Sequence, residues 1–233
     1  MPAAIASIQV GRIRTEGEST SSDSMSLRWT TAFYKFPVSG PVHVHWLGID
    51  DDETADMKHH GGVDKAVLGY SAEHYPAWSA ELSSSDFADP DGSDCGWSAF
   101  GCGAFAENLT ISAQTESSVC IGDRYFVGEH EATAVILEIS QPRQPCWKIS
   151  RRWKHKTLTK QVAKTGRTGW YFRVLREGMI NVNDSMTLIE RRHQNWTIQR
   201  ANDIMLGREA DRYAVAELMA MPELSESWKQ SLA

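Results

Sequence analysis

The stretch SQPRQPCWKI at residues 140–149 carries a cysteine between prolines and positive charges. Two prolines restrict the backbone before Cys146, while Arg143 and Lys148 place cations on either side of it. Nearby cations favour the thiolate, which is the form that ligates metals and attacks electrophiles. Cys146 is therefore a candidate functional residue. A buried structural thiol is the more ordinary role of a lone cysteine, and the local residues leave both roles open.

The segments around this stretch have the composition of β-strands separated by turns. In VHVHW at 42–46, apolar residues alternate with histidines, the period of two that is typical of a half-buried strand. Ser71 is placed to cap a short helix that carries Tyr75 and Trp78. The body is thus predicted to be mainly β with a few short helices, and its strands are expected over 10–14, 42–46, 65–70, 117–128, 132–140, 169–175 and 185–190.

The last forty residues have helical patterns instead. Thr197 is placed to cap one helix, 213–219 is apolar at helical spacing, and Ser225 is placed to cap a last helix. We therefore divide the chain into a β body at 1–192 and a small three-helix unit at 193–233.

Composition limits the classes of function. The 233 residues include 24 Lys and Arg against 30 Asp and Glu, and the net charge of −6 argues against a general nucleic-acid binder. With no membrane-spanning run and no secretory signal, the chain is expected to be cytoplasmic and without a membrane partner. The four cysteines lack CxxC pairing, so free thiols are expected. A long loop is predicted over 83–104, which is rich in Ser, Asp and Gly.

Two further segments are candidate binding sites. The HHGG run at 59–62 allows close backbone approach to a ligand, and Asp64 and Lys65 follow it, which fits either an anion site or a hairpin turn. Asn108 would either offer its amide to a heterocycle or close a turn, and Trp170 is expected in the core. A zinc hydrolase is a weaker alternative, because no HExxH or three-ligand spacing accompanies its candidate ligands His43, His45, Asp50, Asp51, Asp52, Glu53, His59 and His60.

Taken together, six segments resemble the MOSC domain, and most closely its YiiM-like branch. They are WTTAFYKFPVSGPV at 29–42, HGGVDKAVLGYSAEHYPAW at 60–78, FAENLT at 105–110, IGDRYFVG at 121–128, SQPRQPCWKI at 140–149 and TGRTGW at 165–170. The helical tail also resembles the three-helix unit of that branch, so the match covers nearly the whole chain in order.

The resemblance implies a closed β-barrel that binds a molybdopterin-type molybdenum cofactor, with Cys146 as the protein ligand to the metal and the catalytic centre. Thiolate is a soft ligand, which suits a metal already held by the dithiolene sulfurs of the pterin. No pyridoxal phosphate is expected, because the chain has no room for a desulfurase domain. The residues that the resemblance assigns to cofactor binding are Thr31, Lys35, His60, Gly61, Lys65, Asn108 and Arg143.

The same resemblance implies reduction of small N-hydroxylated compounds, such as hydroxylaminopurine base analogues, to amines. The sequence has no flavin or nicotinamide motif, so an external electron-donating reductase, expected to be a flavoprotein, must reload the metal. The alternative is a cofactor-binding or sulfur-carrier module without turnover. No nucleic-acid partner is implied, and the sequence leaves open whether the chain forms a homodimer.

Three residues depart from the family pattern. Ala106 and Asp51 stand where the family commonly has glycine, and Lys65 stands where it often has arginine. The Ala106 methyl group lies where the backbone would approach the pterin, so it affects the pose of the cofactor. The loop around 91–102 is longer than in compact relatives, which affects the shape of the entrance.

Overall fold

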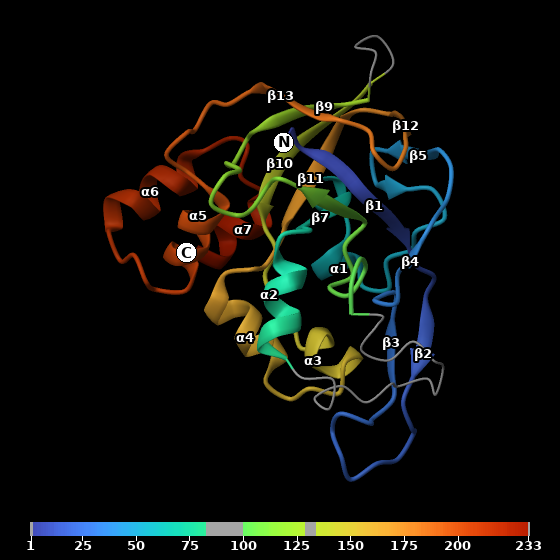
Figure 1. Ribbon diagram of the computed structural model, residues 1–233. Coiled ribbons are helices and arrows are strands. Elements are labelled where there is room, and N and C mark those ends of the chain that lie inside the picture. The colour runs from blue at the N-terminus through green and yellow to red at the C-terminus, as the bar shows by residue number, and fades with distance from the viewer. Residues whose placement is uncertain (1, 83–99, 129–133, 233) are drawn as a thin grey trace.

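The computed structural model describes residues 2–82, 100–128 and 134–232 (Figure 1). Most of the predicted 83–104 loop, with Cys95, lies outside them. The strands are β1 (Ala4–Val10), β2 (Arg14–Glu16), β3 (Trp29–Thr31), β4 (Phe36–Pro37), β5 (Val42–His45), β6 (Gly48–Ile49), β7 (Val67–Ser71), β8 (Leu109–Ser112), β9 (Arg124–Val127), β10 (Val135–Pro142), β11 (Trp170–Arg176), β12 (Gly178–Ile180) and β13 (Met186–Glu190). The helices are α1 (Met57–His60), the 3-10 helix η1 (Val63–Lys65), α2 (His74–Glu81), α3 (Lys148–Arg152), α4 (Leu158–Thr165), α5 (Ile198–Met205), α6 (Arg212–Ala220) and α7 (Glu226–Leu232).

Eight strands form one curled sheet in the order β13-β9-β10-β11-β7-β8-β1-β4. Its pairs are antiparallel except β7 and β8, which the chain joins by crossing over through α2. The predicted closed barrel is wrong, because the sheet is a curled half-barrel. Between β1 and β13 the described residues make an isolated bridge, Ala4 to Ser185, with a few flanking hydrogen bonds rather than a continuous ladder.

Most predicted strands of the body are confirmed, since β5, β7, β9, β10, β11 and β13 lie in the expected segments. The first strand is misplaced: 10–14 straddles a break, and β1 runs over Ala4–Val10 instead. A Cβ on Gly11 would lie 2.5 Å from the Tyr34 carbonyl oxygen, so the backbone just after β1 packs directly against the segment that carries Tyr34. Ser71 is not the N-cap residue of α2, which is Glu73. The Ser71 hydroxyl does accept a hydrogen bond from the Glu73 N–H at 3.2 Å, in the turn that leads into the helix.

The three C-terminal helices are confirmed, including two of their caps. Thr197 Oγ1 accepts a hydrogen bond from the Arg200 N–H at 3.1 Å, and Ser225 Oγ accepts one from the Trp228 N–H at 3.2 Å. In Figure 1 these helices lie together beside β10. Their apolar residues join the main core of the sheet, so the helical unit has no separate core among the described residues. The boundary between 1–192 and 193–233 stays a prediction.

A second, aromatic core packs under α2, α3 and α4 and supports the segment that carries Cys146. Tyr70 stacks on Phe105 with ring centroids 4.5 Å apart, and Phe100 meets Trp153 edge to face at 4.8 Å. The Trp153 indole N–H donates to the Ala104 carbonyl at 2.8 Å. These contacts fix α3 against 100–106, because buried aromatic rings with paired polar groups pack in defined geometries. Within the described ranges, no helix combines the length and apolar character needed to cross a membrane.

Candidate functional site

Cys146 lies between the end of β10 and the start of α3, in the wall of an open pocket with about 600 Å³ of empty space. The pocket gathers segments that are far apart in the sequence. Its walls include the predicted residues Thr31, Lys35, His60, Lys65, Asn108, Arg143 and Cys146, together with Asp52, Asp56, Ala106, Lys148 and Tyr171. Seven of the eight predicted site residues therefore line one pocket.

Arg143 is the most informative side chain in this pocket. It is buried, with 3% of its surface exposed, and one N–H group donates to the Phe105 carbonyl at 3.1 Å. Among the residues that the structure describes, its Nε and Nη1 groups have no hydrogen-bond partner. Since a buried cation with unmade hydrogen bonds is costly, these two donors indicate a place for an anionic or oxygen-rich ligand.

His60 and Lys65 also line the pocket, and they differ in charge. Burial, together with the positive charges of Arg143 and Lys148, lowers the pKa of His60 to about 4. His60 is therefore neutral at pH 7. Lys65 donates to the His59 carbonyl at 2.9 Å, which holds its ammonium group at the pocket wall.

Lys35 and Asn108 are already engaged with the protein. Lys35 forms an ion pair with Asp52, and the side chains are 8% and 10% exposed. The Asn108 amide donates to Asp52 Oδ2 at 2.8 Å, and its oxygen accepts from the Leu68 N–H at 3.1 Å. Both residues therefore shape the pocket wall, and their polar groups are largely used in doing so.

The remaining members of the predicted set have local roles. Thr31 Oγ1 accepts from the Phe33 N–H at 3.0 Å. Gly61 is not among the residues that line the pocket. A Cβ there would lie 2.7 Å from Sδ of the exposed Met57 side chain. Asp64, next to Lys65, pairs with Arg173 at 2.6 Å, which anchors η1 to the sheet.

The acidic run at 50–56 has structural partners. Arg12 pairs with Asp51 and with Glu53, whose carboxylate also accepts from the Ile13 N–H at 2.6 Å. Asp56 caps α1 by accepting from the His59 N–H. His43 and His45 lie on β5, 3.7 and 3.9 Å from Asp50. Among the residues that the structure describes, no three His, Cys, Asp or Glu side chains form a group able to hold a metal ion, so the zinc alternative has no ligand set there.

Two of the departures from the family pattern have left-handed backbones. Ala106 has φ +62° and Asp51 has φ +66°. Glycine adopts this backbone region without strain, whereas a residue with a Cβ is destabilised there by a steric contact between its Cβ and the backbone. The Ala106 methyl group lines the pocket, so this strain is carried at the site itself.

Sequence reasoning did not select Tyr171, Lys148 and Asp56 as site residues. These three also line a second, neighbouring hollow that shares Cys146 with the first, and α7 borders it with Ser227, Gln230 and Ser231. Tyr171 was hidden inside an apolar strand, and burial raises its pKa to about 12. Lys148, two residues after Cys146, was visible as a flanking cation. Trp170 is 1% exposed and belongs to the core, as predicted.

Two family models match the chain. The MOSC domain matches residues 56–187, and the YiiM-like 3-alpha helix domain matches residues 196–233.

Three relatives are similar over most of the chain. The uncharacterized protein YflK of Bacillus subtilis is 35% identical over 201 residues, which are 86% of this chain and 82% of that protein. Protein YiiM of Escherichia coli is 30% identical over 202 residues, which are 87% and 83%. A protein of Gibberella moniliformis named "Reductase" is 33% identical over 221 residues, which are 95% of this chain and 35% of that protein.

Solved structures agree with the family match. The crystal structure of YiiM from Geobacillus stearothermophilus is 31% identical, covers 100% of both chains and superposes with a TM-score of 0.74. That of YiiM from Escherichia coli covers 100% of this chain and 90% of that one, with a TM-score of 0.72 at 24% identity, a likeness of fold alone.

Proposed function

Because this chain belongs to the MOSC family, in its YiiM-like branch, we propose that it is a molybdenum-cofactor-dependent reductase of N-hydroxylated compounds. The observation that carries the proposal is the buried Arg143, which shares a pocket with Cys146 and has two unpaired N–H donors. A phosphorylated, oxygen-rich pterin would meet those donors, and Cys146 would give the metal its thiolate ligand.

The cations of the pocket would bind the cofactor from different positions. The Arg143 guanidinium would donate to phosphate or pterin oxygens from inside the wall, and the ammonium groups of Lys65 and Lys148 would do so from the rim. Lys35 contributes less directly, because Asp52 already neutralises it. The predicted contacts of Thr31, His60 and Asn108 with the cofactor belong to the same proposal.

The bound cofactor would supply the two-electron chemistry. An N-hydroxylated substrate takes up two electrons and two protons and leaves as the amine and one water. Tyr171 Oη keeps its proton at neutral pH, since burial raises its pKa to about 12, and it would donate a hydrogen bond to the oxygen that departs. His60 is neutral and would accept one. The chain thus orients the substrate, while the electrons come from an external reductase.

The direct test is turnover of hydroxylaminopurine by protein expressed with ample molybdate and supplied with a small artificial reductant, reduced methyl viologen. We expect the amine product, its loss in Cys146→Ser, and its retention in the control Cys102→Ser. Bound molybdenum without amine formation would instead support the alternative, a cofactor-binding or sulfur-carrier module.

A further inference from the structure

Positive charge is concentrated in one part of this chain. The segment 139–176 holds 11 of the 24 Lys and Arg residues and has no Asp or Glu. All 30 acidic residues therefore lie elsewhere, together with the remaining 13 basic ones. A net charge of −6 thus conceals one strongly basic region in an otherwise acidic protein, and such a region attracts partners of opposite charge.

Several of these cations are used inside the fold. Arg143 is buried in the pocket, Arg167 pairs with Glu81 of α2 at 2.8 Å, and Arg173 pairs with Asp64 and Glu138. Six others have no ion-pair partner among the described residues, and we call them the basic face. The basic face consists of Lys148, Arg151, Lys154, Lys156, Lys160 and Lys164.

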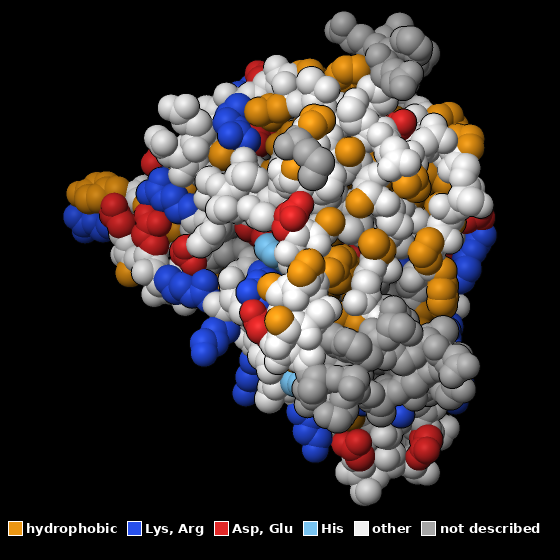
Figure 2. Space-filling model, viewed as in Figure 1, with side chains coloured by type: hydrophobic (Ala, Val, Ile, Leu, Met, Phe, Trp, Pro, Cys, Tyr) orange, Lys and Arg blue, Asp and Glu red, His pale blue; other side chains and the backbone are white. Residues whose placement is uncertain are grey.

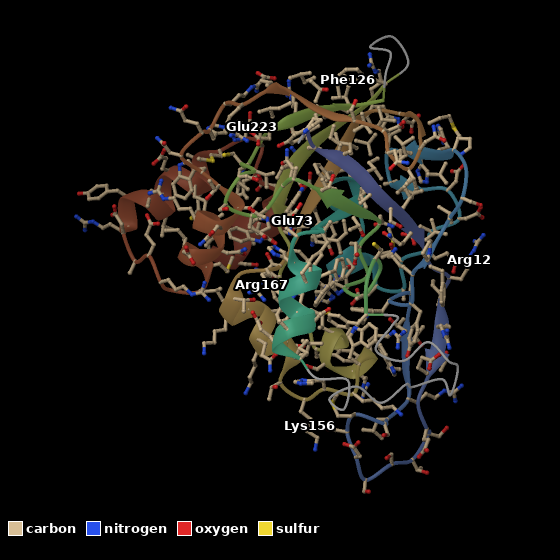
Figure 3. The ribbon with its side chains drawn as sticks, in the orientation of Figure 1. Arg12, Glu73, Phe126, Lys156, Arg167 and Glu223 are labelled. Carbon is tan, nitrogen blue, oxygen red and sulfur yellow. The ribbon has the colours of Figure 1, made fainter. Side chains whose placement is uncertain are left out.

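The basic face follows α3, α4 and the turn between them. Figure 2 shows Lys and Arg side chains along the edge of the molecule that α4 forms, and in Figure 3 the labelled Lys156 points away from the body. Arg151, Lys156 and Lys160 line one shallow hollow beside Trp147. These side chains therefore offer a connected surface of unpaired positive charge.

Trp147 connects the basic face to the pocket. It follows Cys146 directly in the sequence and is 53% exposed, which is unusual for so large an apolar ring. Trp29 supports it with ring centroids 5.4 Å apart, and the Arg151 guanidinium lies 4.9 Å from its ring centroid. An exposed Trp with an adjacent Arg has the residue types that are enriched at interface hot spots.

We infer that the basic face and Trp147 form the docking surface for an acidic electron-carrier protein with a flavin or an iron–sulfur centre near its own surface. The inference rests on the proposed function, which consumes two electrons per turnover that the chain has no motif to supply. The carrier is itself oxidised: one fully reduced flavin can give both electrons, whereas a [2Fe–2S] carrier gives one, so two such carriers dock in turn for each turnover. Charge complementarity would bring it to the face, and Trp147 would place it one residue from the metal ligand.

The opposite charge of the rest of the surface favours a compact acidic protein over nucleic acid. A long polyanion would extend beyond the basic face and meet the acidic remainder of the chain, where it is repelled. A compact acidic protein can contact the basic face without reaching the acidic surface around it.

The first test is direct binding, which needs no turnover. Purified protein is titrated with flavodoxin, a small acidic flavin protein, and in parallel with an acidic [2Fe–2S] ferredoxin, at low ionic strength. Lys156→Glu should weaken binding of the carrier that binds about tenfold, and Lys156→Glu/Lys160→Glu more, while the charge-matched control Arg212→Glu on α6 changes it less than about twofold. Binding by neither carrier, or equal loss in the control, would overturn the inference, as would tighter binding of an oligonucleotide to the same residues.

The second test separates the docking surface from the proposed function. Molybdenum-loaded enzyme is assayed with the carrier that binds and with reduced methyl viologen. Lys156→Glu, which reverses one charge of the basic face, should lose about tenfold in kcat/KM for the protein donor and keep its rate with methyl viologen. Equal rates with the protein donor in both enzymes would contradict the docking surface, whereas no amine from wild type with methyl viologen would contradict the proposed function and leave the binding result to stand.

Discussion

Lys35 and Asp52 form a nearly buried ion pair in the wall of the Cys146 pocket, and Asn108 donates to the same carboxylate at 2.8 Å. The Gly11 N–H donates to Asp52 as well, at 2.8 Å. One acidic residue from the run at 50–56 thus joins β1, the segment before β4 and the segment before β8. This carboxylate therefore ties together three segments of the pocket wall.

Asp52→Asn should destabilise the protein by about 3 kcal/mol, because it leaves the Lys35 ammonium buried without its counter-charge. The measurement is urea unfolding. Asp51→Asn is the matched control, since its partner Arg12 is mostly exposed, and it should change the stability by less than about 1 kcal/mol. Equal effects of the two variants would contradict the role given to the pair.

Ala106→Gly should stabilise the protein by about 1 kcal/mol, because Ala106 holds a left-handed backbone that glycine adopts freely. Thermal unfolding measures the change. Ala104→Gly is the control: Ala104 is buried two residues away and is not among the residues with positive φ, so the same change there should lower the stability. A loss of stability in Ala106→Gly would show that the strain is not real.

His60 should make the free energy of unfolding fall as the pH is lowered from about 6.5 to about 4. The pKa of His60 is lowered to about 4 in the folded state, so in this window His60 is protonated in the unfolded chain and still mostly neutral in the folded protein. His60→Gln should flatten this part of the curve of unfolding free energy against pH, while His155→Gln, away from the pocket, serves as the control. Parallel curves for wild type and His60→Gln would rule out the lowered pKa.

Arg143→Met should leave the cofactor-free protein at least as stable as wild type, because it removes two unpaired buried donors along with one hydrogen bond. The same variant should retain little molybdenum. Denaturant unfolding of the cofactor-free protein and metal analysis of the loaded protein give the two readouts. A large loss of stability with normal metal content would assign Arg143 to the fold instead.

Local sequence was informative where local chemistry determines structure. Hydroxyl caps at Thr197 and Ser225 and apolar spacing at 213–219 predicted the C-terminal helices, and cations beside Cys146 marked the pocket. Long-range pairing was less accessible. Asp52 and Asn108 are 56 positions apart in the sequence, and no local pattern in either segment predicts that they form a hydrogen bond.

The misses have physical reasons of the same kind. β1 was missed because AIASIQV mixes small and polar residues, although Ile5 and Ile8 are fully buried. Tyr171 was missed because its polar atom stands in an otherwise apolar strand. The closed barrel was predicted wrongly because closure depends on hydrogen bonding between distant strands, and the local sequence pattern of each strand carries no information on that pairing.

Metal content distinguishes a molybdenum ligand at Cys146 from a structural thiol. Wild type, Cys146→Ser and the exposed-thiol control Cys102→Ser are expressed side by side with molybdate, purified without reductant and analysed for metal. If Cys146 is the metal ligand, we expect close to one molybdenum per chain in wild type and in Cys102→Ser, and little in Cys146→Ser. Equal molybdenum in all three proteins would contradict it.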